Sequence, residues 1–254
     1  FYYRRHSQNL TSNSERIGKA RRQIKFDSCR KQLAVHRPIT AFIPCRQNHD
    51  YTLNLWDEKI KGKSLLEYSI ETCLQSDLVD CIVVGCDNQK VEKTLERFGS
   101  SKIKFVKRRE SDTRMSTQLG PFIEETLATI DPKFNGISLV KYPQTPFLQS
   151  ATLDEGITSM LVYGGESLEG LVKVNGALYQ RSENGLEPIL EQNQAYDDLG
   201  MIYRDAHVIR VFKNRNLLGG SLLKQPVANF EISEAETFFI DSSERLRVAR
   251  ALSV

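Results

Sequence analysis

Two polar side chains with clear chemical potential each follow a short apolar segment. Arg46 comes shortly after Ile39–Pro44, and Asp87 comes shortly after residues 80–85. A guanidinium can hold a phosphate-rich ligand through charge-assisted hydrogen bonds, and a carboxylate in such a place can contact a ribose or a metal ion, or cap a following helix. Arg46 and Asp87 can also simply pair with each other. His49 could act as an acid or base, but its spacing identifies no partner.

The cysteines and the single tryptophan are more typical of packing than of catalysis. The five cysteines are odd in number and include no Cys-x-x-Cys pair, which disfavours a zinc ribbon or a secreted disulfide framework and favours a reducing compartment. Cys45 and Cys86 follow two predicted strands and are expected to be close together as small buried hydrophobes, with a nucleophilic role as the alternative. Trp56 is interpreted as a packing residue rather than a base-stacking platform.

The elements that must position these residues alternate between strands and helices. Apolar runs predict strands at 39–44, 80–85, 103–106 and 137–141, and helical spacing predicts helices at 64–76, 88–98, 116–130 and 153–162. Strands that alternate with helices require crossover connections, so the predicted fold class is α/β, with a doubly wound and mainly parallel sheet.

The second half of the chain has a different rhythm. Strands are predicted at 170–174, 177–181, 207–212 and 227–232, with a hairpin signal at 183–185 and a closing helix at 242–252. We expect these strands to add a small antiparallel arm. Ligands of open α/β sheets bind beyond the carboxyl ends of the strands, which directs attention to the loops at 45–61, 86–89, 108–115 and 142–148.

The N-terminal segment differs from the rest in charge. Residues 1–37 carry ten Lys or Arg against two acids, while the whole chain of 254 residues has a net charge of only +3. We predict a flexible basic arm at 1–37, attached to a domain at 38–254. Such an arm could touch an anionic membrane surface; nucleic acid is a less favoured partner. Its aromatic and Arg-rich start resembles the flank of an upstream membrane helix, or an organelle transit peptide.

The composition places the chain among ordinary globular proteins. It is 40% hydrophobic and 26% charged, and it has no stretch approaching the roughly 20 apolar residues that span a bilayer. A cytoplasmic location is favoured, although membrane tethering or organelle import through an N-terminal segment stays open.

Several motifs together resemble one enzyme family. The segments that carry the resemblance are 43–46, 62–70, 84–87, 96–99, 142–148, 177–179, 197–198, 203–206 and 240–242. Their order and spacing from Ile39 to the C-terminus are similar to those of the cytidylyltransferases that activate sialic acid and related nonulosonic acids. No single motif is decisive. The resemblance implies a nucleotide-diphospho-sugar transferase-like fold and a homo-oligomer.

The resemblance also implies a reaction and a set of site residues. CMP is transferred from CTP to an acidic sugar when the sugar hydroxyl attacks the α-phosphate, pyrophosphate leaves and Mg²⁺ shields the charge. Arg46 would be the catalytic cation, with further nucleotide contacts from Lys61, Asp87 and Thr145. The same comparison implies sugar contacts from Asp197 and Tyr203 and a metal contact from Asp241.

The chain departs from that family at several chemically important positions. Gln47 and Asn48 replace a pair of glycines, Asp50 replaces a lysine, Leu55 and Trp56 replace a Lys-Asn pair, and Phe239 replaces one of two alternating Asp residues. An Asp near a triphosphate repels it. Lys59, Lys61 and Lys63 could compensate. The alternative hypothesis is therefore a catalytically inactive protein that uses the same fold for binding or assembly.

Overall fold

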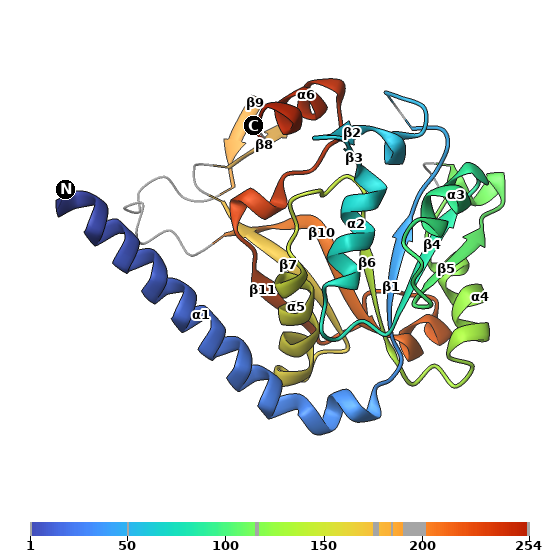
Figure 1. Cartoon of the computed structure of the whole chain (residues 1–254), viewed down its shortest axis with the longest axis horizontal. Helices are drawn as coiled ribbons and strands as arrows, with labels where there is room; N and C mark the ends of the chain where they lie inside the picture. The colour runs from blue at the N-terminus through green and yellow to red at the C-terminus, as the bar shows by residue number, and fades with distance from the viewer. Residues whose placement is uncertain are drawn as a thin grey trace.

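A seven-stranded mixed sheet forms the centre of the computed structural model (Figure 1). The structure describes residues 2–49, 51–114, 117–174, 178–183, 185–189 and 202–252, with residues 2–17 described without their side chains. The strand order of the sheet is β11-β7-β10-β6-β1-β4-β5. The strands are β1 (Ile39–Pro44), β4 (Cys81–Cys86), β5 (Ile103–Lys107), β6 (Ile137–Lys141), β7 (Ser167–Lys173), β10 (Tyr203–Lys213) and β11 (Val227–Glu231).

The sheet is mainly parallel, as the sequence predicts. β1 pairs in parallel with β4 and β6, and β4 pairs in parallel with β5, whereas β10 runs antiparallel to β6 and β7. The chain moves from β1 outward to β4 and β5 and then returns to place β6 on the other side of β1. This reversal of strand order between β1 and β6 is where α/β folds open a ligand site.

Helices cover both faces of the sheet because its strands alternate apolar side chains between two clusters. In β1, Ala41 and Ile43 join the core under α1 (Tyr2–Val35), α2 (Leu65–Leu74), α3 (Lys90–Glu96) and α5 (Ser150–Val162). Phe42 points to the opposite face, where it packs with residues of α4 (Gly120–Ile130). Both faces are therefore buried, as expected for a doubly wound sheet.

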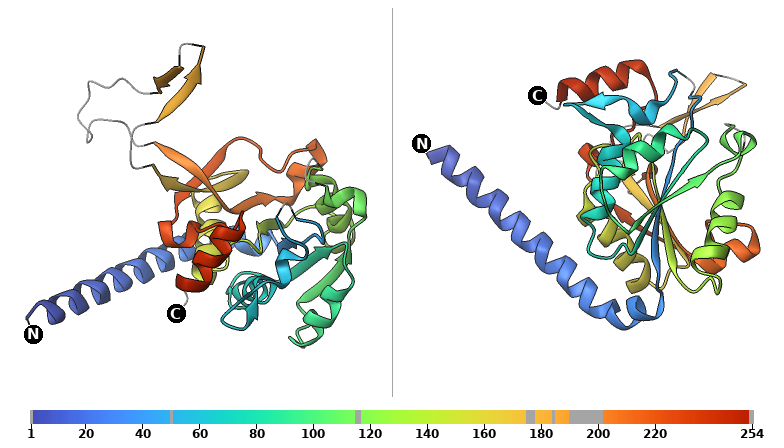
Figure 2. Two further views of the ribbon diagram at one scale, coloured as in Figure 1. Left: turned by 90° about the horizontal axis from the view of Figure 1, so that it is seen from above. Right: turned by 45° about the vertical axis from the view of Figure 1, so that its right-hand side comes forward.

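Two small hairpins and the last helix complete the described fold. The hairpin of β2 (Lys59–Ile60) and β3 (Lys63–Ser64) leads into α2, whose start is fixed by a capping box between Ser64 and Glu67. A third apolar cluster joins this region to α6 (Ser243–Leu252). The hairpin of β8 (Tyr179–Ser182) and β9 (Gly185–Pro188) projects from the body (Figure 2), which agrees with the predicted antiparallel arm.

The prediction that residues 1–37 form a flexible arm outside the core is wrong for the second half of that segment. α1 extends away from the body at its N-terminal end but lies along α5 at its C-terminal end (Figures 1 and 2). There Cys29 and Leu33 are buried in the main core, and Nζ of Lys25 lies 2.8 Å from Oε1 of Glu155 on α5. Phe26, Cys29 and Leu33 share one helical face, an apolar stripe that the surrounding basic residues obscure.

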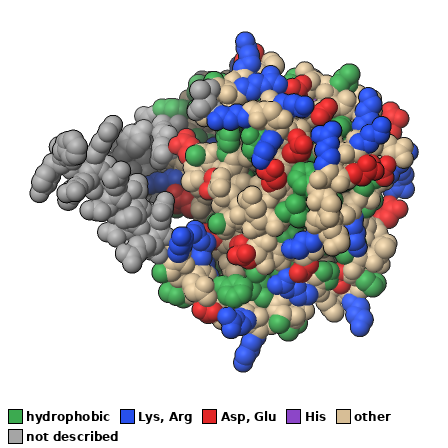
Figure 3. All heavy atoms as spheres, viewed as in Figure 1, with side chains coloured by type: hydrophobic (Ala, Val, Ile, Leu, Met, Phe, Trp, Pro, Cys, Tyr) green, Lys and Arg blue, Asp and Glu red, His purple; other side chains and the backbone are tan. Residues whose placement is uncertain are grey.

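The surface around the helices carries mixed charge. Figure 3 shows Lys and Arg interspersed with Asp and Glu over the visible face, without a large area of one sign. No helix among the described residues is both long and apolar enough to cross a membrane.

Candidate active site

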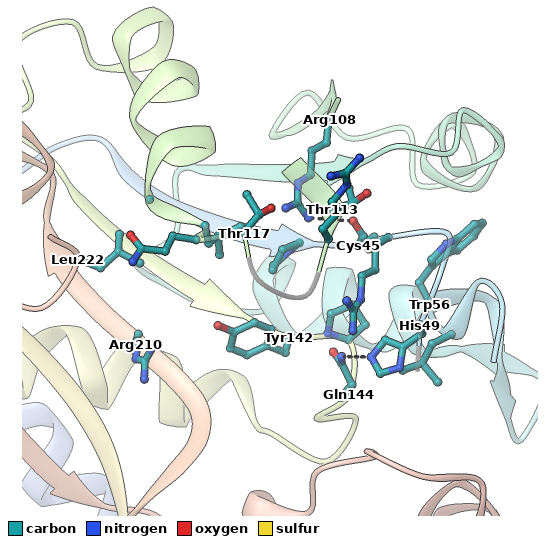
Figure 4. Close-up of a pocket in the computed structure, with 18 of the residues that line it drawn as sticks. Cys45, His49, Trp56, Arg108, Thr113, Thr117, Tyr142, Gln144, Arg210 and Leu222 are labelled. Carbon is teal, nitrogen blue, oxygen red and sulfur yellow. Dashed lines mark hydrogen bonds between the residues drawn. The ribbon is translucent and has the colours of Figure 1, made fainter. Parts of the chain in front are cut away.

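A cavity of about 610 Å³ opens at the carboxyl ends of the parallel strands, where the strand order reverses. Its walls come from the loops after β1, β5 and β6 and from β10, which runs antiparallel to β6. In the view of Figure 4, Tyr142 lies between Arg210 on one side and the His49–Gln144 pair on the other. The predicted loops therefore do converge, and Arg46 lies in the wall of the cavity.

Among the described residues that line this cavity, every charged side chain is an arginine. Four arginines line it, namely Arg46, Arg108, Arg114 and Arg210, and none of the described lining residues is Asp or Glu. Guanidinium groups offer several N–H donors in a planar fork that suits phosphate and carboxylate oxygens. The cavity is consequently suited to a polyanion.

Arg108 links two of the loops that line the cavity. It is 7% exposed, and its Nη1 donates to the carbonyl oxygen of Cys45 at 3.1 Å while Nη2 donates to the carbonyl oxygen of Asp112. Its guanidinium also lies 5.1 Å from the ring centre of Phe122. Burial lowers the pKa of Arg108 although Cys45 and Asp87 oppose that effect. Arg108 thus supplies positive charge to the cavity while fixing its shape.

Asp87 also joins loops rather than lining the cavity. Its Oδ1 accepts a hydrogen bond from the backbone N–H of Gln47 at 2.7 Å, and its Oδ2 accepts from Oγ1 of Thr113 at 3.1 Å. The alternative of a cap for the next helix does not hold, because α3 begins after Gln89 without a side-chain cap. The structure therefore gives Asp87 a supporting position next to the predicted nucleotide site.

The cysteines beside these groups are buried, as interpreted from the sequence. Cys45 lines the cavity but is 3% exposed, and Cys86 is fully buried. Burial raises the pKa of Cys45 well above its ordinary value and raises that of Cys86 to about 12. A thiol that stays protonated is a poor nucleophile, so packing is the role that the geometry favours.

Two predicted nucleotide contacts lie outside the cavity wall. Lys61 forms the tight turn of the β2–β3 hairpin with Gly62, at φ values of 47° and 83°, and its side chain is exposed. Thr145 is fully buried; its Oγ1 donates to the carbonyl oxygen of Tyr142 at 2.8 Å. The turn geometry holds Lys61 at the surface, and burial keeps Thr145 beneath the loop, so neither contacts the cavity in this conformation.

A lysine that sequence reasoning missed lies under the same loop. Lys141 is the last residue of β6 and is fully buried, and its Nζ has four oxygen neighbours: Oγ of Ser69 at 3.1 Å, the carbonyl of Tyr142 at 3.1 Å, and the carbonyl and Oγ1 of Thr145 at 2.7 and 3.0 Å. Burial lowers the pKa of Lys141 to about 7. The ammonium fixes the start of the loop that carries Tyr142 and Gln144 into the cavity.

His49 and Trp56 close the other side of the cavity. Nε2 of His49 lies 3.0 Å from Nε2 of Gln144, and the His49 ring packs edge-on against Tyr51 at 5.1 Å. Trp56 is 4% exposed and belongs to the main core, in agreement with its interpretation as a packing residue. Trp56 also lines the cavity.

A second cavity of about 650 Å³ adjoins the first. Tyr142 and Arg210 line both cavities, and Arg204, His207 and Arg245 line the second alone, together with Asp205, Ala206, Ile209, Thr237, Phe239 and Asp241. Two adjoining cavities that share a wall can hold two reactants with their reacting ends close together.

The described residues do not fit the Mg²⁺ site that the resemblance implies. Asp241 lines the second cavity, but its Oδ1 lies 3.6 Å from Nε of Arg245, and Phe239 places a ring against Tyr142 at 6.3 Å where the family has a second carboxylate. No group of three or more His, Cys, Asp or Glu side chains in the described part of the chain is arranged to hold a metal. Hard divalent cations need several oxygen ligands.

The two predicted sugar contacts have different outcomes. Asp197 lies outside the described residues. Tyr203 is the first residue of β10, is 36% exposed, and pairs with Lys173 of β7. It does not line either cavity.

A comparison with family models decides the relationship. The model of the family described as cytidylyltransferase matches residues 58–244, which is well over half of the chain. The chain belongs to the cytidylyltransferase family. No curated protein sequence matches it.

Solved structures agree on the fold. A CMP:2-keto-3-deoxy-manno-octonic acid synthetase complexed with CTP matches with a TM-score of 0.66 at 14% identity, covering 85% of this chain and 98% of the other. The 4-diphosphocytidyl-2C-methyl-D-erythritol synthase of Anaerococcus prevotii matches with a TM-score of 0.63 at 14% identity, covering 90% and 98% of the two chains. At this identity these similarities establish the nucleotidyltransferase-like α/β fold of the present protein.

One of the cavity arginines carries no sequence signal of its own. Arg210 lies within a predicted strand, but its place at the cavity depends on β10 running antiparallel beside β6, with Arg210 opposite Val140. Arg114, by contrast, lies in the loop at 108–115 to which the sequence directs attention. The position of Arg210 follows from tertiary arrangement, which the order of residues along the chain does not reveal.

Proposed function

We propose that this member of the cytidylyltransferase family binds CTP in the arginine-lined cavity and transfers CMP to an acidic sugar of the sialic or nonulosonic acid class in the adjoining cavity. Four arginines around the first cavity, with no acid among its described lining residues, carry the proposal. The family match supports the choice of nucleotide.

The positive charge suits the ligand at both ends of the reaction. A triphosphate brings several negative charges, and each is stabilised by a nearby guanidinium in a partly desolvated cavity. The second cavity adds Arg204 and Arg245, which could bind the carboxylate of an acidic sugar. Arg210 lies in the shared wall, but its guanidinium is already paired with Glu169 and Asp205, so the proposal assigns the neutralisation of phosphate charge mainly to Arg46, Arg108 and Arg114.

The proposed reaction joins the two cavities. The sugar hydroxyl oxygen attacks the α-phosphorus of CTP, the bond to the β-phosphate oxygen breaks, and pyrophosphate leaves. Tyr142 and Arg210 would align the two reactants along their shared wall. Because the described residues do not form the implied metal site, the proposal assigns charge neutralisation to the arginines.

Calorimetric titration of CTP in the presence and absence of Mg²⁺ is the first test, with UTP and ATP as matched nucleotides. We expect CTP to bind in both conditions and more tightly than the other two. The same protein is then incubated with CTP and either N-acetylneuraminic acid or 2-keto-3-deoxy-manno-octonic acid, and CMP-sugar and pyrophosphate are quantified. Absence of CTP binding would contradict the proposed site.

A second candidate function is nucleotide binding without transfer. It is favoured by Phe239 and by the pairing of Asp241 with Arg245. That candidate predicts CTP binding with no CMP-sugar under any condition. The homo-oligomer, the contact with an anionic membrane surface and the reducing cytoplasmic compartment stay predictions.

A further inference from the structure

His207 has an unusual backbone conformation inside β10. Its φ is 55°, in the left-handed region that residues other than Gly seldom adopt, with Asn, Asp and His the most frequent exceptions. It lies where the pairing of β10 with β7 shifts register between Asp205 and Arg210. Bulges of this kind redirect a side chain and are frequent beside active sites.

One carboxylate holds both the backbone and the ring of His207. Oδ1 of Asp205 accepts a hydrogen bond from the His207 backbone N–H at 2.8 Å, and Oδ2 lies 2.8 Å from Nδ1 of the imidazole. A carboxylate on Nδ1 keeps the proton there and leaves Nε2 as the basic nitrogen.

A further set of contacts fixes that carboxylate in turn. Nη2 of Arg210 lies 3.3 Å from Oδ2 of Asp205, and Nε of Arg210 lies 2.9 Å from Oε1 of Glu169 on β7. Asp205 and Glu169 are both largely buried, with side chains 22% and 21% exposed, while the His207 side chain is 67% exposed. The imidazole ring is therefore accessible to a ligand, whereas the carboxylates of Asp205 and Glu169 are largely shielded from solvent.

This support extends to the nucleotide cavity. Arg210, which anchors Asp205, lines both cavities, and His207 lines the second. The charged and titratable groups that share the second cavity with the imidazole are Tyr142 after β6, Arg204, Asp205 and Arg210 on β10, and Asp241 and Arg245 at α6. Arg204 and Arg245 line the same cavity as the ring and offer guanidinium groups to the carboxylate of an acidic ligand.

We propose that His207, oriented by Asp205, is the general base that removes the proton from the acceptor hydroxyl in the second cavity. This inference rests on the proposed function. As the hydroxyl oxygen forms its bond to the α-phosphorus, its proton passes to Nε2 of His207, and the electron pair of the broken α–β phosphoanhydride bond leaves with pyrophosphate. The imidazolium beside Asp205 releases the proton to solvent after the product departs.

The test compares the parent with His207→Asn, Asp205→Asn and His36→Asn. Asn at 207 keeps a side-chain nitrogen near Asp205 and tolerates a positive φ, but it lacks Nε2. His36 is the matched control, because it lies before β1 and its Nδ1 lies 3.0 Å from the carbonyl oxygen of Asn135, away from both cavities. CTP affinity, thermal unfolding, and kcat and KM for CMP transfer are measured for each.

The expected result separates the base from a structural residue. His207→Asn should lower kcat by about 10²-fold or more. Its CTP affinity should stay within about twofold of the parent, because the proton transfer to His207 occurs only in the transition state. Asp205 is a positioning residue, so Asp205→Asn should lower kcat less than His207→Asn and leave CTP affinity within about twofold of the parent, because the ring loses the carboxylate that orients it but keeps Nε2. His36→Asn should match the parent.

The contrary outcomes are distinct. Equal kcat in the parent and His207→Asn would overturn the assignment of the base and leave the proposed function standing. A parent that binds CTP but makes no CMP-sugar would overturn the transfer reaction and the base together. If His207→Asn and Asp205→Asn lose kcat to the same extent and both melt at a lower temperature than the parent, the pair serves only to hold the bulge, and the assignment of the base is overturned.

Discussion

Lys141→Met should change how the stability of this protein depends on pH. The ammonium of Lys141 is fully buried at the end of β6, and burial lowers its pKa from 10.5 to about 7. In the unfolded chain the lysine keeps its ordinary pKa. Between about pH 7 and 10.5 the unfolded state therefore binds more protons than the folded state, so the free energy of unfolding rises with pH across this window.

The magnitude follows from the size of that shift. Each pKa unit corresponds to about 1.4 kcal/mol. The buried lysine therefore lowers the free energy of unfolding by about 5 kcal/mol at pH 7 and below, and this destabilisation vanishes near pH 10.5. The slope within the window approaches about 1.4 kcal/mol per pH unit. The four oxygens around Nζ solvate the ammonium and offset part of the penalty, which makes this an upper limit.

Urea unfolding at pH 6.5, 7.5, 8.5 and 9.5 measures the slope for the parent, Lys141→Met and Lys104→Met. Methionine removes the proton-binding group but leaves oxygens without a donor, so the stability at one pH mixes two effects, whereas the slope isolates titration. Lys104→Met makes the same chemical change at an exposed residue of β5. If Lys141→Met keeps the slope of the parent and of Lys104→Met, the argument from burial is refuted.

Three further perturbations test other parts of the structure. Leu33→Ala should lower the free energy of unfolding by about 2–4 kcal/mol in urea, because Leu33 is buried in the main core. Val35→Ala, at a residue that is 70% exposed, should lower it little. Equal losses in the two variants would show that α1 does not pack on the body. Gly136→Ala should cost about 1–3 kcal/mol, since its Cβ would overlap a backbone carbonyl oxygen, and Gly219→Ala, with open space around its Cβ, is the control; two equally stable variants would contradict the close approach. Arg46→Ala should weaken CTP binding about tenfold by calorimetry, with a larger effect at low salt, and unchanged affinity would place the nucleotide elsewhere.

The central sheet could be predicted because its signals are local. Strands such as β1 and β4 are continuous apolar runs, and the intervening helices carry their apolar residues at helical spacing, so periodicity fixes both their type and their order. The packing of α1 could not be read in the same way. Its buried residues, including Cys29 and Leu33, stand among lysines and arginines, and only the contact with α5 shows which face is covered.

The candidate site was predictable in place but only partly in content. The end of β1 and the loop after β6 meet where expected, and Arg46 lies there. Lys61 and Thr145 were expected to contact the nucleotide because of their positions in family motifs. A tight turn and complete burial place them elsewhere, and the pairing that brings Arg210 to the wall depends on strand register.

The positive charge around a cavity can come from several elements that are distant in the sequence, not only from one loop. This chain lacks the lysines that the resemblance implies after β1, yet guanidiniums from the loops after β1 and β5 and from β10 line one cavity. Arg108 is committed to two carbonyl oxygens, but a committed guanidinium keeps its charge, and a charge 4 Å from a phosphate is worth about 4 kcal/mol at an effective dielectric constant of 20. Counting lost motif residues therefore overstates the loss of affinity for a polyanion. Metal binding differs in this respect, because it requires several oxygens at one point, and distant acids cannot replace the carboxylate that is missing at Phe239.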